Sequence, residues 1–173
     1  MIRAAINGYG RIGRSVLRAL YESGARDEIQ VVAINEPADC KTIAHLTKYD
    51  STHGRFPGSV AVEDDLLTIN GDPISVFHSE DILALPWREL AVDVVLECSG
   101  AFTDRDTAEK HLTAGAGKVL FSQPAEPSVD ATVVLGVNEH RLTGQETIIS
   151  NASCSTNCVI PAIDALHRVW RGA

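Results

Sequence analysis

Two short segments of the chain combine residue types and spacings that could bind a phosphorylated ligand and attack a carbonyl carbon. The first, Gly8-Tyr9-Gly10-Arg11-Ile12-Gly13, has the spacing GxGxxG. The second, residues 150–158, reads SNASCSTNC and places Cys154 among hydroxyl-bearing neighbours. Glycine amides at the start of a helix suit a diphosphate, whereas a thiol beside hydroxyl groups suits nucleophilic attack.

The glycine-rich segment lies between an expected strand, Ile2–Asn7, and an expected helix, Arg11–Glu22. In this context Gly8 permits the tight turn, Gly10 lets the backbone approach a pyrophosphate, and Gly13 allows close packing of the helix against the sheet. The alternative is a plain strand–turn–helix with incidental glycines. The context favours a dinucleotide-binding turn.

Glu36 follows a second apolar run, residues 29–35, and lies roughly 20 residues after the last glycine, as in dinucleotide-binding folds. A carboxylate at this position accepts hydrogen bonds from ribose hydroxyls and repels a 2′-phosphate. The pattern therefore predicts NAD rather than NADP. A solvated loop carboxylate is the alternative.

Cys154 follows an expected strand, 147–150, and begins an expected helix over 154–170. A cysteine in the first helical turn is favoured as the thiolate by the helix dipole, and free amides beside it could hold an oxyanion or a phosphate. A buried structural thiol is the alternative. No histidine is placed by spacing as the base, so the sequence shows a nucleophile without its partner.

The remaining cysteines are interpreted as structural. Cys98 and Cys158 fit core positions, and Cys40 fits an inert thiol at the start of a helix over 39–48. No CxxC pair and no Cys/His set at zinc spacing is present, so no metal site is expected from spacing. Free thiols predict a reducing, cytoplasmic location.

Composition excludes several functional classes. The chain has 173 residues, a formal net charge of −8 and a hydrophobic fraction of 45%. Its Lys and Arg residues are scattered, so we expect no nucleic-acid or membrane partner, and a bound phosphate must rely on backbone amides. No apolar run approaches the roughly 18 residues of a membrane span, and no signal-peptide pattern opens the chain.

The order of elements predicts the fold class. Continuous apolar strands alternate with helices, with short strands expected at 59–62, 66–70 and 74–77, and further strands at 92–98, 119–121 and 132–135. A helix is expected over 103–114, and Pro161 is expected to kink the last helix. Such alternation indicates an α/β fold with a mostly parallel, doubly wound sheet of the Rossmann type.

Several segments together resemble the glyceraldehyde-3-phosphate dehydrogenase family. They are Asn7–Arg14, Lys48–Phe56, Glu97–Thr103, Gly136–Asn138 and Ser150–Cys158. Within the family, Arg18–Gly24, Leu85–Leu90, Lys118–Ser122, Asp130–Val134 and the glutamate at 36 in place of the usual aspartate look like the D-erythrose-4-phosphate dehydrogenase branch.

The resemblance implies roles for individual residues. Cys154 would be the nucleophile, and NAD the cofactor. The cofactor would be held by Gly8, Gly10, Arg11, Ile12, Gly13, Glu36, Glu80, Ser99, Gly100 and Ser122, and the substrate by Ser153, Cys154, Ser155 and Thr156. Ser155 stands where threonine is more usual. Glu80 stands where relatives often carry a basic residue beside the adenine, which is harmless if that contact is made by backbone.

The resemblance also implies a domain division and a reaction. Residues 1–151 would form the NAD-binding domain, and residues 152–173 would begin a catalytic domain whose histidine base and phosphate-binding arginine lie beyond residue 173. The reaction would oxidise D-erythrose 4-phosphate through a thiohemiacetal and a thioester, on the route to pyridoxal phosphate. A phosphorylating glyceraldehyde-3-phosphate dehydrogenase portion and a non-catalytic NAD-binding module are the alternatives. The 173-residue chain alone is expected to be inactive, and the full-length protein to be a homotetramer.

Overall fold

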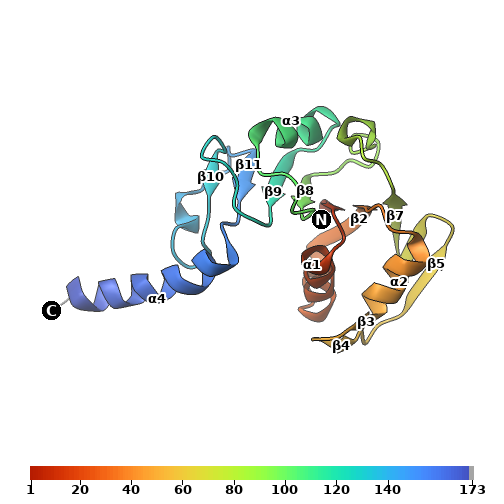
Figure 1. Ribbon diagram of the computed structural model, residues 1–173, viewed down its shortest axis with the longest axis horizontal. Coiled ribbons are helices and arrows are strands. Elements are labelled where there is room, and N and C mark those ends of the chain that lie inside the picture. The colour runs from red at the N-terminus through yellow and green to blue at the C-terminus, as the bar shows by residue number, and fades with distance from the viewer. Residues whose placement is uncertain (172–173) are drawn as a thin grey trace.

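The expected strands pair into one nine-stranded, mostly parallel sheet in the computed structural model, which describes residues 1–171 (Figure 1). The strand order is β10-β11-β9-β8-β1-β2-β7-β6-β5. The parallel strands are β1 (Ile2–Asn7), β2 (Ile29–Asn35), β7 (Asp72–Phe77), β8 (Val94–Glu97), β9 (Lys118–Phe121), β10 (Ala131–Thr132) and β11 (Ile148–Ser150). β5 (Val60–Glu63) and β6 (Leu66–Ile69) extend one edge in antiparallel pairing.

The topological switch point of the sheet, where the order of successive strands reverses, lies between β1 and β8. β1 pairs with β2 on one side and with β8 on the other, so the first strand is central. Of the strands in this sheet, those from β2 to β7 lie on one side of β1, and those from β8 to β11 lie on the other. In open parallel sheets, ligands bind beyond the carboxyl ends of the strands at such a point. The predicted doubly wound Rossmann-type fold is confirmed.

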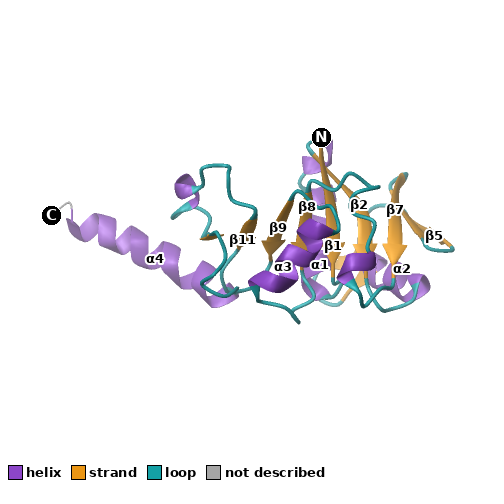
Figure 2. Cartoon of the chain, turned by 90° about the horizontal axis from the view of Figure 1, so that it is seen from above, coloured by secondary structure: helices purple, strands orange, loops and turns teal. Residues whose placement is uncertain are grey.

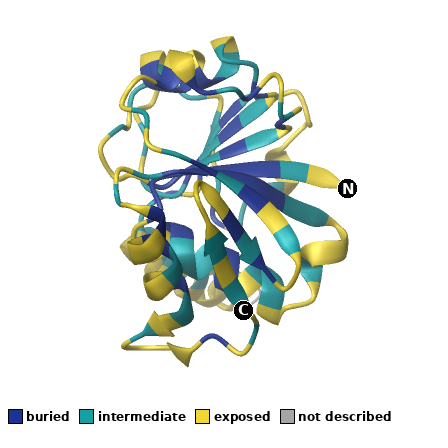
Figure 3. Cartoon of the chain, turned by 90° about the vertical axis from the view of Figure 1, so that its right-hand side faces the viewer, coloured by how far each residue is buried: buried dark blue, intermediate teal, exposed yellow. Residues whose placement is uncertain are grey.

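Helices cover both faces of the sheet (Figures 1 and 2). α1 (Arg11–Glu22) and α2 (Cys40–Lys48) lie on one face, where Leu17 and Ile43 join a buried cluster with Ile6 of β1. α3 (Arg105–Thr113) lies on the other face, where Ala108 packs with Val119. The central strands are therefore buried on both sides, which Figure 3 shows as dark bands across the sheet.

Three details differ from the sequence expectation. The strand expected over 132–135 ends at Thr132, because the Val134 amide donates to the Asn138 side chain instead of continuing a ladder. A short hairpin of β3 (Tyr49–Asp50) and β4 (Gly54–Arg55) was not predicted. The strand expected over 74–77 starts earlier, because β7 already begins at Asp72.

The last helix, α4 (Cys154–Arg171), continues through Pro161 and projects beyond the β10–β11 edge of the sheet (Figures 1 and 2). Its apolar side chains recur at helical spacing and are exposed, namely Val159, Ile163, Leu166 and Trp170. Within residues 1–171, no helix combines the length and apolar character that a membrane span requires. The domain boundary at 151/152 stays a prediction.

Candidate functional site

The glycine turn joins β1 to α1 at the centre of the sheet. Gly8 adopts a φ of +87°, and a Cβ there would lie 2.3 Å from the Ser99 Cα. A Cβ on Gly13 would lie 2.5 Å from the Gly8 carbonyl oxygen. Gly8 therefore allows the β1 and β8 ends to approach each other, and Gly13 allows α1 to start directly against the turn.

The first turn of α1 has the features of an anion site. Gly10 caps the helix without a side-chain hydrogen bond, and no acidic residue lies in the first turn. A Cβ on Gly10 would meet no atom within 4 Å, so the backbone there faces open space. Amides of Arg11 and Ile12 lie in that turn, where helix N–H groups have no intrahelical partner. This arrangement fits the diphosphate of a dinucleotide.

Glu36 lies at the end of β2, beside the glycine turn. Its Oε2 accepts a hydrogen bond from the Tyr9 amide at 2.7 Å, and its own amide donates to the Phe77 carbonyl at 2.9 Å. These bonds fix the carboxylate between β1 and β7. Its Oε1 has only a long contact, 3.4 Å, from the Ala38 amide, and so keeps capacity to accept a bond from a ribose hydroxyl.

A cavity of about 340 Å³ opens at the carboxyl ends of β1, β2, β7 and β8. Three of the predicted cofactor-binding residues line this cavity, namely Gly8, Glu80 and Ser99. A fourth, Gly100, directly follows Ser99 in the chain. Pro37, Ile82, Ala101 and Phe102 supply apolar walls. The mixture of apolar walls and strand-end polar groups suits the adenosine part of a dinucleotide.

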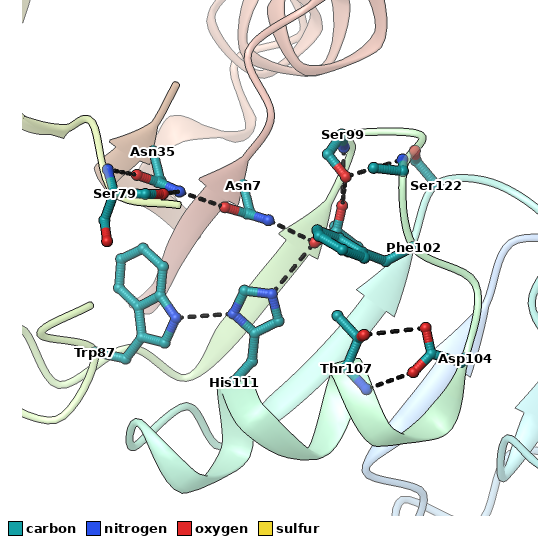
Figure 4. A network of polar contacts seen from close by, with 12 residues as sticks. Asn7, Asn35, Ser79, Trp87, Ser99, Phe102, Asp104, Thr107, His111 and Ser122 are labelled. Carbon is teal, nitrogen blue, oxygen red and sulfur yellow. Dashed lines mark hydrogen bonds and ion pairs between the residues drawn. The ribbon is translucent and has the colours of Figure 1, made fainter. Parts of the chain in front are cut away.

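A buried chain of hydrogen bonds supports the floor of this cavity (Figure 4). Asn35 Nδ2 donates to Asn7 Oδ1 at 2.8 Å, and Asn7 Nδ2 donates to Glu97 Oε2 at 2.6 Å. Asn35 also exchanges two bonds with the Ser79 backbone, each 3.0 Å long. These side chains hold the ends of β1, β2, β7 and β8 in register around the cavity.

The series of buried hydrogen bonds continues from Glu97 to the other face of the sheet. Trp87 Nε1 donates to His111 Nδ1 at 3.0 Å, and His111 Nε2 lies 3.2 Å from Glu97 Oε2. Because an indole nitrogen can only donate, His111 Nδ1 accepts and Nε2 carries the proton toward Glu97. All three side chains are fully buried. Sequence reasoning did not identify this set, since no linear motif joins its members.

Burial raises the pKa of Glu97, but hydrogen bonds from His111, Ser99 and Asn7 outweigh it and leave the pKa below its usual value. Burial raises the pKa of the neighbouring Cys98 thiol to about 11. Glu97 is therefore ionised and Cys98 is protonated at neutral pH. This supports the interpretation of Cys98 as a structural residue.

The segment around Cys154 forms a second candidate region. Ser153 caps α4, because its Oγ accepts from the Thr156 amide at 3.0 Å and lies 2.7 Å from Thr156 Oγ1 and 2.9 Å from Ser155 Oγ. Cys154 is exposed in the first helical turn, and Cys158, which the sequence predicts as a core residue, is exposed as well, so that prediction is wrong for the described residues. Ala152 adopts a φ of +57°, an unusual conformation for a residue with a Cβ. The hydroxyl groups of Ser153, Ser155 and Thr156 therefore cluster at the start of α4, the helix that Cys154 begins.

Ser122 follows β9 and lies between the two regions in the chain. Its amide donates to the Glu97 carbonyl at 3.0 Å, and its Oγ donates to Gln123 Oε1 at 2.7 Å. Ser122 thus lies beside the β8 end that forms the cavity. Its role in binding the cofactor stays a prediction.

A family model described as "Glyceraldehyde 3-phosphate dehydrogenase, NAD binding domain" matches residues 2–105. That range includes the glycine turn, Glu36, Glu80, Ser99 and Gly100. The chain belongs to the glyceraldehyde-3-phosphate dehydrogenase family. Its cofactor is NAD, and the residues at the strand ends fit that cofactor. The role of each residue within the site remains a prediction, as do the catalytic roles of the residues around Cys154.

Proposed function

We propose that this chain supplies the NAD-binding domain and the cysteine nucleophile of a D-erythrose-4-phosphate dehydrogenase. The observation that supports this most is the presence, in one chain of this family, of the glycine turn with Glu36 and an exposed Cys154 beside a cluster of hydroxyl groups. The preference for erythrose 4-phosphate comes from segments of the sequence that resemble that branch.

In the proposed reaction, the Cys154 thiolate forms a C–S bond to the aldehyde carbon, and the carbonyl oxygen takes up a proton. Ser153, Ser155 and Thr156 would hold substrate oxygens through hydrogen bonds. NAD, when bound, would supply the acceptor for the hydride that leaves this carbon, while the hydroxyl group formed in the first step gives up its proton and becomes the thioester carbonyl. The resulting thioester is cleaved by water, which releases the carboxylic acid and returns the thiol.

The reaction is tested with the complete gene product. We expect NADH formation from D-erythrose 4-phosphate without inorganic phosphate. Cys154→Ser should lower turnover by about 10³-fold or more, because a hydroxyl is a much weaker nucleophile than a thiolate. Cys158→Ser, the matched removal of a second exposed thiol on α4, should retain turnover.

Strict dependence on inorganic phosphate with glyceraldehyde 3-phosphate would instead favour the phosphorylating reaction. Efficient turnover by the 173-residue chain alone would show that a residue within this chain serves as the base. Binding of NAD by calorimetry without turnover is the outcome expected for this chain.

The choice of NAD over NADP gives a separate prediction. Glu36→Gln should weaken NAD binding by about tenfold, because the carboxylate makes charge-assisted hydrogen bonds worth about 1.5–3 kcal/mol. The same variant should reduce the ratio of NAD affinity to NADP affinity, because the carboxylate that repels a 2′-phosphate is removed. Glu89→Gln, the same change at an exposed glutamate outside the cavity, should alter neither affinity. Calorimetric titration of both variants measures this. An unchanged preference in Glu36→Gln would contradict the assigned role.

A further inference from the structure

Three side chains that are metal ligands in many proteins meet at a place separate from the NAD cavity. Cys40 Sγ lies 3.8 Å from Asp65 Oδ1 and 3.7 Å from His78 Nε2. His78 Nε2 lies 3.6 Å from the same Asp65 oxygen. One sulfur, one nitrogen and one oxygen atom therefore form a nearly equilateral triangle.

The size of this triangle matches one face of a tetrahedral zinc site. Zinc–ligand bonds of about 2.3 Å to sulfur and about 2.0–2.1 Å to nitrogen and oxygen, at tetrahedral angles, place the ligand atoms about 3.3–3.6 Å apart. The observed separations of 3.6–3.8 Å exceed these values by only about 0.3 Å or less. Small side-chain movements would therefore complete the coordination.

Three different elements bring the ligands together. Cys40 is the first residue of α2, and His78 directly follows β7. Asp65 lies in the tight turn between β5 and β6, and its carbonyl accepts a hydrogen bond from the Val76 amide at 2.8 Å. The backbone around each ligand is thus held by the sheet and its covering helix, which limits the reorganisation needed to bind an ion.

The orientation of His78 is set for ligation. Its Nδ1 lies 2.7 Å from the Glu36 carbonyl oxygen. Because a carbonyl can only accept, Nδ1 carries the proton and Nε2 presents its lone pair to Cys40 and Asp65. Metal-bound histidines almost always make such a bond through the nitrogen that does not bind the metal.

The surroundings are open and acidic. A cavity of about 750 Å³ borders the three ligands and gives an ion access from solvent. Its other charged groups are the carboxylates of Asp39 and Asp64 and the ammonium of Lys41, so carboxylates outnumber cations there. Binding of an ion to the Cys40 sulfur would release the thiol proton into solvent.

We propose that Cys40, Asp65 and His78 form a binding site for a divalent transition-metal ion, with Zn²⁺ as the best fit. The three protein ligands leave a fourth position for water, which is the pattern of an open zinc site. A thiolate and an imidazole in one set also disfavour Mg²⁺ and Ca²⁺, which take oxygen ligands.

The test is titration of the full 173-residue chain with Zn²⁺ by calorimetry and with Co²⁺ by absorption spectroscopy. We expect one ion per chain and a near-ultraviolet thiolate-to-cobalt charge-transfer band. Cys40→Ser should abolish the band. His78→Gln and Asp65→Asn should each weaken metal binding by at least about tenfold, because replacement of a residue that only supports a metal ligand already costs about 10–100-fold in affinity.

Matched controls separate this site from adventitious binding. Cys158→Ser and His45→Gln remove an exposed thiol and an exposed imidazole elsewhere, and both should retain one ion per chain and the full band. Because Cys40 is buried, circular dichroism checks that its variant folds, and the two exposed-ligand variants test the site if it does not. Absence of stoichiometric binding, or a band that survives Cys40→Ser or disappears in Cys158→Ser, would overturn the proposal.

Discussion

Gly8→Ala is expected to lower the free energy of unfolding by about 3 kcal/mol and to remove measurable NAD binding. Two costs add at this position. Its φ of +87° penalises a residue with a Cβ by about 1–2 kcal/mol. The new Cβ would also lie 2.3 Å from Ser99 Cα and 2.7 Å from the Cys98 carbonyl carbon, so the backbone of the β8 end must move.

Gly24→Ala separates the two costs. Gly24 has a similar φ of +77°, but a Cβ there would meet no atom within 4 Å. We expect this variant to lose only the conformational part, about 1–2 kcal/mol, and to bind NAD normally. Urea denaturation followed by circular dichroism gives both stabilities. Equal losses in the two variants would show that the approach of β1 to β8 is not the constraint at Gly8.

Gly10→Ala separates folding from binding at the same turn. Gly10 has an ordinary φ of −69° and open space around its Cα, so the free energy of unfolding should fall only by the cost of alanine at a helix N-cap, about 1 kcal/mol or less. The added methyl group would occupy the space through which a diphosphate approaches the helix. We expect NAD affinity to fall by about tenfold or more, equivalent to about 1.4 kcal/mol. Unchanged affinity would contradict placement of the diphosphate beside Gly10.

The sequence predicts the central fold because its strongest patterns have local causes. The β-branched strand Ile29–Asn35 is followed by Glu36, and Asp39 caps the next helix by accepting from the Thr42 amide at 3.0 Å. Both features depend on neighbours within a few residues. The short β3–β4 hairpin lacks such a signal, because two-residue strands show no periodicity.

The polar groups that join distant segments could not be predicted in the same way. Asn7, Glu97 and His111 occupy three separate elements, and only the parallel pairing of β1 with β8 brings the first two together. The same reason explains why the sequence does not predict the contacts of Cys40. Its neighbours Asp65 and His78 are distant in sequence and meet it only after β5, β6 and β7 pair.

Glu97→Gln is expected to lower the free energy of unfolding at pH 7 by about 3 kcal/mol. The Glu97 carboxylate is fully buried and accepts from four donors. Oε2 faces Asn7 Nδ2 and His111 Nε2, and Oε1 faces the Ser99 amide and hydroxyl. A glutamine can match only one of these sides. Its NH₂ group must face donors on the other side, which leaves buried N–H groups unpaired.

The pH dependence identifies the charge as the cause. Because the pKa of Glu97 is lower in the folded chain than in the unfolded chain, ionised Glu97 stabilises the fold above its unfolded value, about 4.3. This contribution is lost as pH falls through the folded pKa, so the difference in the free energy of unfolding between wild type and Glu97→Gln should shrink below about pH 4.

The control is Glu109→Gln, which removes an exposed carboxylate paired with Arg105 on α3 and should cost about 0.5 kcal/mol or less. Urea denaturation at pH 7 and at about pH 3 measures all three proteins. A difference between wild type and Glu97→Gln that stays constant with pH would contradict a stabilising role of the buried carboxylate. A loss of stability in Glu109→Gln as large as that in Glu97→Gln would show that burial of the carboxylate is not the cause.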